Sequence, residues 1–234
     1  MMQIRSQIER LGLPPPVRHQ AFVSLLNAGR GELDSSPADL SVNDLNMGIG
    51  EFFTPAFQFR GGKGKVKRGD LSVAMSHLLA WRSVAQGNHC LHPPSRSSDD
   101  CWVLILEDDV KLNIPDTCLL RGGGQTRIKL DPLPPDADMV LLFPSRLIKQ
   151  DCSSHPSCEM FSEVSDGSGL IGYVVSRRSA KKLVRVFEQV KLRMPIDLQI
   201  YKLPGISVFA SKADWILHQD NIPSDRIAQN GLAE

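Results

Sequence analysis

The chain has 234 residues, of which 41% are hydrophobic and 23% charged, so its composition is that of an ordinary globular protein and its length suits one α/β domain. A formal net charge of +1 provides no global field to attract nucleic acid or an anionic membrane, and any anion must bind at a local patch. The longest apolar runs, residues 102–106 and 139–143, have five residues each, which excludes a membrane-spanning helix of about 20 residues.

Neither end of the chain carries a recognisable targeting signal. Charges are scattered through the first sixteen residues without an apolar segment between them, so a secretory signal is not expected. The last four residues are not a retention signal. The absence of these signals is the pattern of a cytoplasmic protein, an incomplete N-terminus would allow an endomembrane lumen, and the sequence leaves the compartment open.

The first half of the chain contains one strong helix between weaker elements. Apolar spacing predicts a short amphipathic helix over residues 2–13, and a strand is expected within residues 17–26. Residues 27–69 are read as irregular loops because Gly, Ser, Asp and Pro are frequent there. The clearest helix covers residues 71–86, where apolar side chains recur every three or four residues and Asp70 stands at the expected N-cap.

Helices and short apolar runs alternate in the rest of the chain, which favours an α/β layer architecture. We therefore expect a single domain over residues 1–234 with a Rossmann-like, mixed, mainly parallel sheet flanked by helices. The elements expected there are, in order, a loop at 88–100, a strand at 102–106, a loop at 121–136, strands at 139–143 and 169–176, a helix at 179–190 and a strand at 206–210.

Three acidic residues, Glu107, Asp108 and Asp109, directly follow the apolar run 102–106. Ligands of open α/β sheets bind beyond the carboxyl ends of strands. Adjacent carboxylates repel one another unless a cation neutralises them, and their hard oxygens suit Mg²⁺ or Mn²⁺. Along an extended chain Glu107 and Asp109 would share one side, with Asp108 on the other. Solvated or capping acids at a strand end are an equally weighted alternative, and the cluster alone names no reaction.

The surroundings of the cluster resemble a known enzyme family. The segment GDLSVAMSHLLAW at 69–81, followed by WVLILEDDV at 102–110, is similar to glycosyltransferase family 25, which includes lipopolysaccharide-type sugar transferases and procollagen galactosyltransferases. The similarity runs in pieces from about residue 5 to residue 227. Its further pieces are the motifs at 172–176, 180–183, 195–197, 218–220 and 224–225.

The resemblance implies a GT-A fold and a metal-dependent transfer of a hexose, galactose or similar, from a UDP-sugar to a hydroxyl of a saccharide or glycoprotein, with inversion. It implies no nucleic-acid partner and no transmembrane segment. Two departures from the family pattern stand out. The usual first strand and its turn are missing ahead of the first helix, and Val73, Ala74 and Met75 replace the usual Gly-Cys before the Ser-His pair.

The resemblance also suggests roles for individual residues. Asp109 and Glu107 would be metal ligands that hold Mn²⁺ or Mg²⁺. His218 is a candidate for a further ligand. Asp108 would bind the donor ribose or support a neighbouring ligand. The remaining candidates are Ser76 and His77 for the donor side, Asp197 as first choice of general base and Asp166 as second choice.

Each of these residues also has an ordinary structural reading. His218 could be a surface histidine, and His77 could be a helix histidine bonded to a neighbour. Asp197 and Asp166 could cap a helix or form an Asx turn. The basic run at 60–68 could cover a diphosphate, although a solvated charged loop is the commoner outcome.

The five cysteines contain no CxxC pair. Cys152 and Cys158 could close a short disulfide loop, or join His155 in a partial zinc site. Ordinary thiols in a loop are the preferred interpretation.

Three functions therefore compete. The first is a metal-dependent glycosyltransferase, and the second is a catalytically inactive relative that serves as an interaction module. The third is a different metal-dependent enzyme, which would need a phosphate loop or a nucleophile that the sequence does not show.

Overall fold

The computed structural model describes residues 2–11, 68–87, 101–107, 110–114, 119–122, 125–128, 133–143, 147–150 and 156–218. The chain divides into two compact units, and each is discontinuous in sequence. The first unit comprises Met1–Arg18, Leu104–Val175 and Ser207–Glu234, and the second comprises His19–Val103 and Ser176–Ile206. The single domain expected over residues 1–234 stays a prediction.

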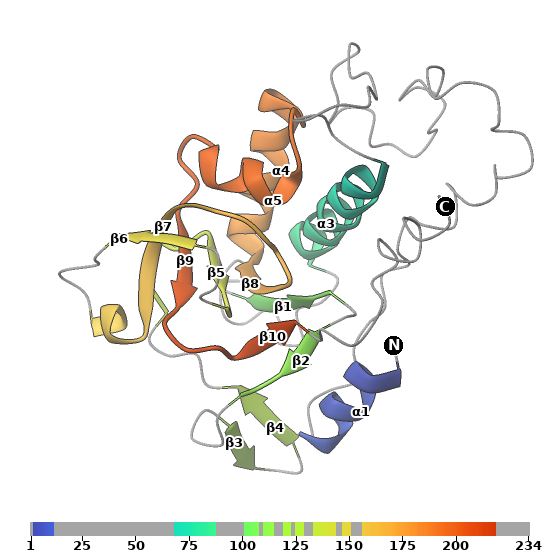
Figure 1. The fold of residues 1–234 in the computed structure, drawn as a ribbon, viewed down its shortest axis with the longest axis vertical. Helices are drawn as coiled ribbons and strands as arrows, with labels where there is room; N and C mark the ends of the chain where they lie inside the picture. Colours follow the sequence, from blue (N-terminus) through green and yellow to red (C-terminus); the bar gives the residue numbers. More distant parts are fainter. Residues whose placement is uncertain are drawn as a thin grey trace, which may run out of the picture. The chain divides into compact units, whose positions relative to one another are not determined.

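A six-stranded sheet belongs mostly to the first unit (Figure 1). All residues of the three neighbouring interior strands β8, β5 and β9 are buried, so both faces of these strands are covered. The strands are, in their order across the sheet, β1 (Trp102–Leu106), β8 (Gly172–Ser176), β5 (Met139–Leu141), β9 (Val208–Ser211), β7 (Phe161–Gly167) and β6 (Leu147–Gln150).

The sheet is mixed, but its described pairings are mostly antiparallel. Only the β5–β9 pairing is parallel among those with a described register, whereas β5–β8, β7–β9 and β6–β7 are antiparallel. The expectation of a mainly parallel sheet is therefore wrong. The sequence could not predict the strand directions, because a short strand buried on both faces is apolar throughout, whether its neighbour runs parallel or antiparallel.

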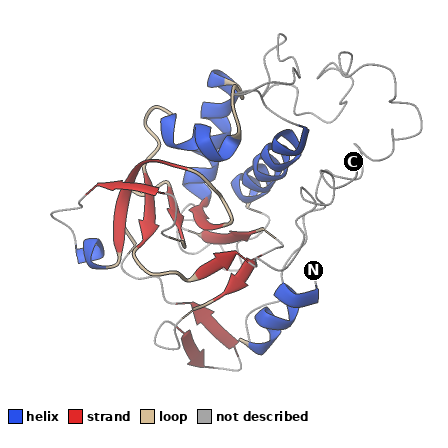
Figure 2. Ribbon diagram, viewed as in Figure 1, coloured by secondary structure: helices blue, strands red, loops and turns tan. Residues whose placement is uncertain are grey.

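Two small antiparallel sheets complete the strands of the first unit (Figure 2). One pairs β2 (Val110–Leu112) with β10 (Ile216–His218), and the other pairs β3 (Leu119–Gly122) with β4 (Gln125–Ile128). The second pair corrects the loop expected at 121–136, since only two residues separate β3 from β4. A Gly-Gly pair between two short strands is a hairpin signal that the sequence reading overlooked.

Helix α1 (Met2–Arg10) lies beside β2 in the first unit (Figure 1). The backbone N–H of Leu112 donates a hydrogen bond of 2.8 Å to Gln7 Oε1, so the helix satisfies a donor that the two-stranded sheet leaves open. Ile8 is buried on the same helix. A short 3₁₀ helix, η5 (Pro156–Glu159), precedes β7.

The second unit contains helices α3 (Arg68–Gln86), α4 (Arg177–Val190) and α5 (Ile196–Gln199), followed by the 3₁₀ turn η6 (Ile200–Lys202). Its core joins α3 to α4, where the rings of Trp81 and Phe187 are both fully buried with centroids 5.6 Å apart. Helix α4 begins at Ser176, whose hydroxyl accepts a hydrogen bond of 3.0 Å from the Ser179 N–H.

The predicted elements within the described residues are confirmed in type, with shifted ends. Helix α1 ends before residue 13, and α3 starts at Arg68, so Asp70 lies inside the helix and is not its N-cap. The strand expected at 17–26 and the loops at 88–100 lie outside the described residues, as does most of the segment 27–69. None of the helices in the described part of the chain has the length and hydropathy needed to cross a membrane.

Candidate functional site

Glu107 stands at the carboxyl end of β1, where the strand leaves the sheet. Its backbone N–H donates a hydrogen bond of 2.9 Å to the carbonyl oxygen of Ile171, which precedes β8. At the other end of the two strands, the N–H of Arg177 donates to the carbonyl of Cys101. Because these bonds join opposite ends, β1 runs antiparallel to β8. The backbone of Glu107 is thus held at the amino end of β8.

Gly172 makes a close approach possible at this edge of the sheet. A Cβ built on Gly172 would lie 2.2 Å from Ile216 Cδ1 and 3.1 Å from Leu106 Cδ2. The carbonyl of Gly172 accepts a hydrogen bond of 3.0 Å from the N–H of Leu142, and the carbonyl of Leu142 accepts one of 3.1 Å from the N–H of Ile216. A glycine at the start of β8 therefore lets the ends of β1, β5 and β10 meet around one point.

The register of β10 against β2 brings His218 next to the acidic segment. The two strands are antiparallel, with Ile216 opposite Leu112 and His218 opposite Val110. Val110 directly follows Asp109 in the chain, so the three acids form the connection between β1 and β2. The sequence predicted both His218 and the acids as ligands, and the topology places the backbone of His218 opposite the residue that follows the acids.

The strand directions also define which edge of the sheet this is. Strand β1 is antiparallel to β8, β8 to β5, and β5 is parallel to β9. Strands β1, β5 and β9 therefore run the same way, and their carboxyl ends share one edge. In α/β sheets this is the edge where ligands bind. Among the described pairings, only β5 and β9 are hydrogen-bonded neighbours that run parallel.

Asp166 is not brought to this edge. Strand β7 begins at Phe161, which lies opposite Ser211 at the carboxyl end of β9, and then runs away from that end. Asp166 comes five residues later, opposite Ile148 of β6, or about 16 Å along an extended strand. Its Oδ1 accepts a hydrogen bond of 2.8 Å from the N–H of Gly167. Asp166 thus lies within β7 and not in the turn expected from the sequence, and its role as a general base stays a prediction.

The donor-side candidates Ser76 and His77 lie on α3 in the second unit. Ser76 is half-buried, whereas His77 is only 5% exposed and its ring centroid lies 6.2 Å from that of Trp81, one turn further along the helix. The side chain of His77 is thus part of the packed interior of this unit, and a donor-side role for it stays a prediction.

Asp197 also lies in the second unit, in the first turn of α5, and its side chain is half-buried. An acid in this position favours the start of a helix through the exposed N–H groups and the helix dipole. The helix-terminal role that the sequence left open for Asp197 is therefore consistent with its position. A catalytic role for Asp197 stays a prediction.

Asp108 and Asp109 lie outside the described residues, and for His218 only the backbone is described. Within the described part of the chain, no three His, Cys, Asp or Glu side chains gather as metal ligands do. The residues of the predicted ligand set that the structure does locate are Glu107, which is half-buried, and the backbone of His218.

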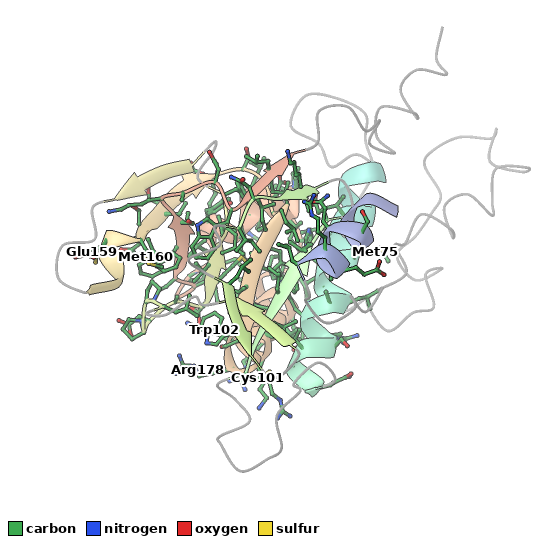
Figure 3. The ribbon with its side chains drawn as sticks, turned by 90° about the horizontal axis from the view of Figure 1, so that it is seen from below. Met75, Cys101, Trp102, Glu159, Met160 and Arg178 are labelled. Carbon is green, nitrogen blue, oxygen red and sulfur yellow. The ribbon has the colours of Figure 1, made fainter. Side chains whose placement is uncertain are left out.

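Cys158 and Cys101 are both disulfide-bonded, which corrects the preference for ordinary thiols. Cys101, labelled in Figure 3, directly precedes β1, and Cys158 lies in η5. These disulfides were not expected, because the number of cysteines is odd and their spacing in the sequence did not favour pairing. Cys152, His155 and the basic run at 60–67 lie outside the described residues.

Two supporting residues of the first unit were missed in the sequence. Gly172 was read only as the start of an apolar strand, although a glycine inside a strand pattern often marks a close approach of another backbone. Asp138 is 5% exposed, and its Oδ2 accepts a hydrogen bond of 3.0 Å from the N–H of Ser207 just before β9. No sequence pattern singled out Asp138, because its partner is 69 positions away.

Comparison with known proteins gives one informative relative. A protein of Haemophilus influenzae named "Putative glycosyltransferase" is 23% identical to this chain over 183 residues, which cover 74% of the chain and 58% of the relative. The chain thus spans somewhat more than half the length of that protein. No family model matches the chain. The similarity supports a relationship with glycosyltransferases in general and does not distinguish family 25 among them.

Proposed function

We propose that this chain transfers a hexose, galactose or similar, from a UDP-sugar to a hydroxyl group of a saccharide or glycoprotein. The proposal places the donor diphosphate at the carboxyl ends of β1 and β5, beside Glu107. It is supported by the similarity to a protein named as a glycosyltransferase, and by an acidic connection at the sheet edge where α/β folds bind ligands.

The observation that carries the proposal is the pairing of His218 with Val110. Paired residues in an antiparallel ladder have Cα atoms about 4.5–5.5 Å apart, and consecutive Cα atoms are about 3.8 Å apart. The Cα atoms of Val110 and His218 are therefore about 4.5–5.5 Å apart, and Val110 is the residue that directly follows Asp109 in the chain. A histidine opposite the residue that ends the acidic segment supports our proposal of one shared cation site.

The chemistry of the donor set fits Mn²⁺ or Mg²⁺. Carboxylate oxygens of Glu107 and Asp109 are hard ligands that either cation accepts, and an imidazole nitrogen of His218 would favour Mn²⁺. When bound, the cation would stabilise the negative charge on the departing nucleoside diphosphate. The hydrogen bond from Glu107 N to Ile171 O fixes the first residue of this set against β8.

The chain's own side chains would divide the remaining tasks. Asp108 would bind the donor ribose or orient a neighbouring ligand, and Ser76 with His77 would act on the donor side. An inverting transfer needs a base to accept the proton of the attacking hydroxyl. Asp197 remains the first candidate for this base. Asp166 is the weaker candidate, because the sheet register carries it away from the edge where Glu107 lies.

Binding of UDP in the presence and absence of Mn²⁺ tests this function. We expect Mn²⁺ to strengthen UDP binding, and the variant Asp109→Asn to weaken the metal-dependent binding at least about tenfold, which corresponds to about 1.4 kcal/mol. Glu163→Gln is the matched control, because Glu163 is an exposed acid on β7. Absence of UDP binding in every condition would favour the catalytically inactive interaction module instead, and UDP binding that ignores both the metal and Asp109 would contradict the proposed metal site.

A further inference from the structure

Helix α4 and the residues after it carry a concentration of positive charge that the whole chain does not share. The segment from Arg177 to Lys202 contains eight Lys and Arg against two Asp and Glu, whereas the entire chain has a net charge of +1. This is the local patch that an almost neutral chain would need in order to attract an anionic partner.

Four of these cations form one face of α4. Arg178, Lys181, Lys182 and Arg185 follow the spacing i, i+3, i+4 and i+7, which brings side chains together on one side of a helix. All four are exposed, whereas the buried side chains of α4 are Ser179, Ala180, Leu183 and Phe187 on its other side. We call these four residues the cationic face.

The helix itself gains nothing from this arrangement. Its first turn contains no acidic residue, although acids are favoured there and cations are not. Like charges three and four residues apart also repel one another. Lys181 and Lys182 also have interactions within the protein, and it is the exposure of all four side chains that makes the face accessible to an anionic surface. An external anionic surface would relieve both unfavourable effects.

The surroundings of the cationic face select among anionic partners. A specific protein partner needs buried aromatic or apolar anchors, and single-stranded nucleic acid needs exposed rings for stacking. In the described part of the second unit, the rings of Trp81 and Phe187 are buried, and those of Trp102 and Tyr201 are half-buried rather than exposed. Leu198 on α5 is the one large hydrophobic side chain found exposed among the described residues. A cationic face without exposed aromatic anchors suits a partner whose negative charge is spread over its surface.

We infer that the cationic face of α4 binds the surface of a membrane that contains anionic lipids. Polybasic segments are attracted to such surfaces without inserting into them, and each Lys or Arg strengthens the binding about fivefold. The binding should weaken as salt is added, since it is electrostatic. Arg178, labelled in Figure 3, is the second residue of α4, so the face starts in the first turn of the helix.

Sedimentation with vesicles tests the inference. The full chain is mixed with vesicles of phosphatidylcholine alone or of phosphatidylcholine with phosphatidylserine, at low and high salt. We expect binding only to the vesicles with phosphatidylserine, and only at low salt. The double variant Arg178→Gln, Arg185→Gln should weaken that binding about 25- to 30-fold, because two cations are removed.

A second double variant, Arg10→Gln with Lys111→Gln, is the control, since it removes two exposed cations from the first unit and should leave vesicle binding unchanged. Equal thermal unfolding temperatures of the variants, measured by circular dichroism, exclude misfolding as the cause of lost binding. Equal loss in both double variants would overturn the inference. The inference would also be overturned if the protein bound RNA or polyglutamate in preference to the vesicles at the same salt concentration.

Discussion

The side chain of Arg177 reaches back to the end of another helix, where its Nε donates a hydrogen bond of 3.1 Å to the carbonyl oxygen of Ala85. Ala85 lies in the last turn of α3, where carbonyl groups lack helical partners and a cation is favoured. The backbone N–H of the same arginine donates to the carbonyl of Cys101. One residue thus joins the end of α3, the start of α4 and the chain that enters β1.

Loss of this contact should destabilise the protein. We expect Arg177→Gln to lower the free energy of unfolding by about 1–3 kcal/mol, which is typical for a hydrogen bond from a charged donor to a buried or half-buried acceptor. Arg178→Gln is the control, because Arg178 is the exposed neighbour on the same helix. Urea unfolding followed by circular dichroism measures both. Equal stability of the two variants would show that the contact contributes nothing.

Gly87 offers a second test at the same place. Its φ of +85° suits glycine, and an added Cβ would lie 3.1 Å from Cζ of Arg177. Gly87→Ala should therefore cost about 1–2 kcal/mol for the left-handed backbone and more for the displaced guanidinium. Gly205→Ala is the matched control, since Gly205 has a φ of +71° and an added Cβ would meet nothing within 4 Å. Thermal unfolding should show the larger loss for Gly87→Ala, and a larger loss for Gly205→Ala would contradict the account.

Gln199 is a buried polar residue with a structural task. Its Nε2 donates a hydrogen bond of 2.7 Å to the carbonyl of Lys191, and its Oε1 accepts one of 2.8 Å from the N–H of Arg193. These bonds support the turn after α4, where Lys191 has a φ of +63°. Gln199→Leu should lower the free energy of unfolding by about 1–3 kcal/mol, because it leaves buried backbone groups unpaired. Gln189→Leu, at an exposed position of α4, should have little effect in the same unfolding assay.

The junction at Gly172 predicts a specific rescue. Gly172→Ala should destabilise the protein by about 1–3 kcal/mol and weaken metal-dependent UDP binding, because its Cβ would collide with Ile216 Cδ1 at 2.2 Å. Removing that atom with Ile216→Val makes room, so the double variant should recover part of both losses. Additive losses in stability would mean that the two residues do not determine each other's position.

The sequence predicted well the elements whose pattern is local. The stripe of α3, with Leu78 and Trp81 facing inward, and the apolar run of β1 were both recognised because their side chains repeat at the period of the element. Even there the start of α3 was misplaced, since Asp70 resembles an N-cap but the helix continues back to Arg68. Helix ends depend on competing local interactions more than on periodicity.

Long-range pairing was not predictable in the same way. Strands β2 and β10 have three residues each, which is too short for a period to show, and their register joins residues more than 100 positions apart. The direction of β8 against β5 is equally invisible in an apolar run that is buried on both faces. The candidate ligands Glu107, Asp109 and His218 were named from residue type and family resemblance, whereas the opposition of His218 and Val110 comes only from the fold.

A double-mutant cycle on Mn²⁺ binding tests the central claim most directly. Mn²⁺ affinity in the presence of UDP is measured for the wild type, for Asp109→Asn, for His218→Gln and for the double variant. If both side chains hold one cation, each substitution should reduce Mn²⁺ affinity much less when the other residue has already been substituted. The coupling free energy between the two substitutions should then be at least about 1 kcal/mol. Strictly additive losses, or unchanged affinity in His218→Gln, would contradict a shared cation between β2 and β10.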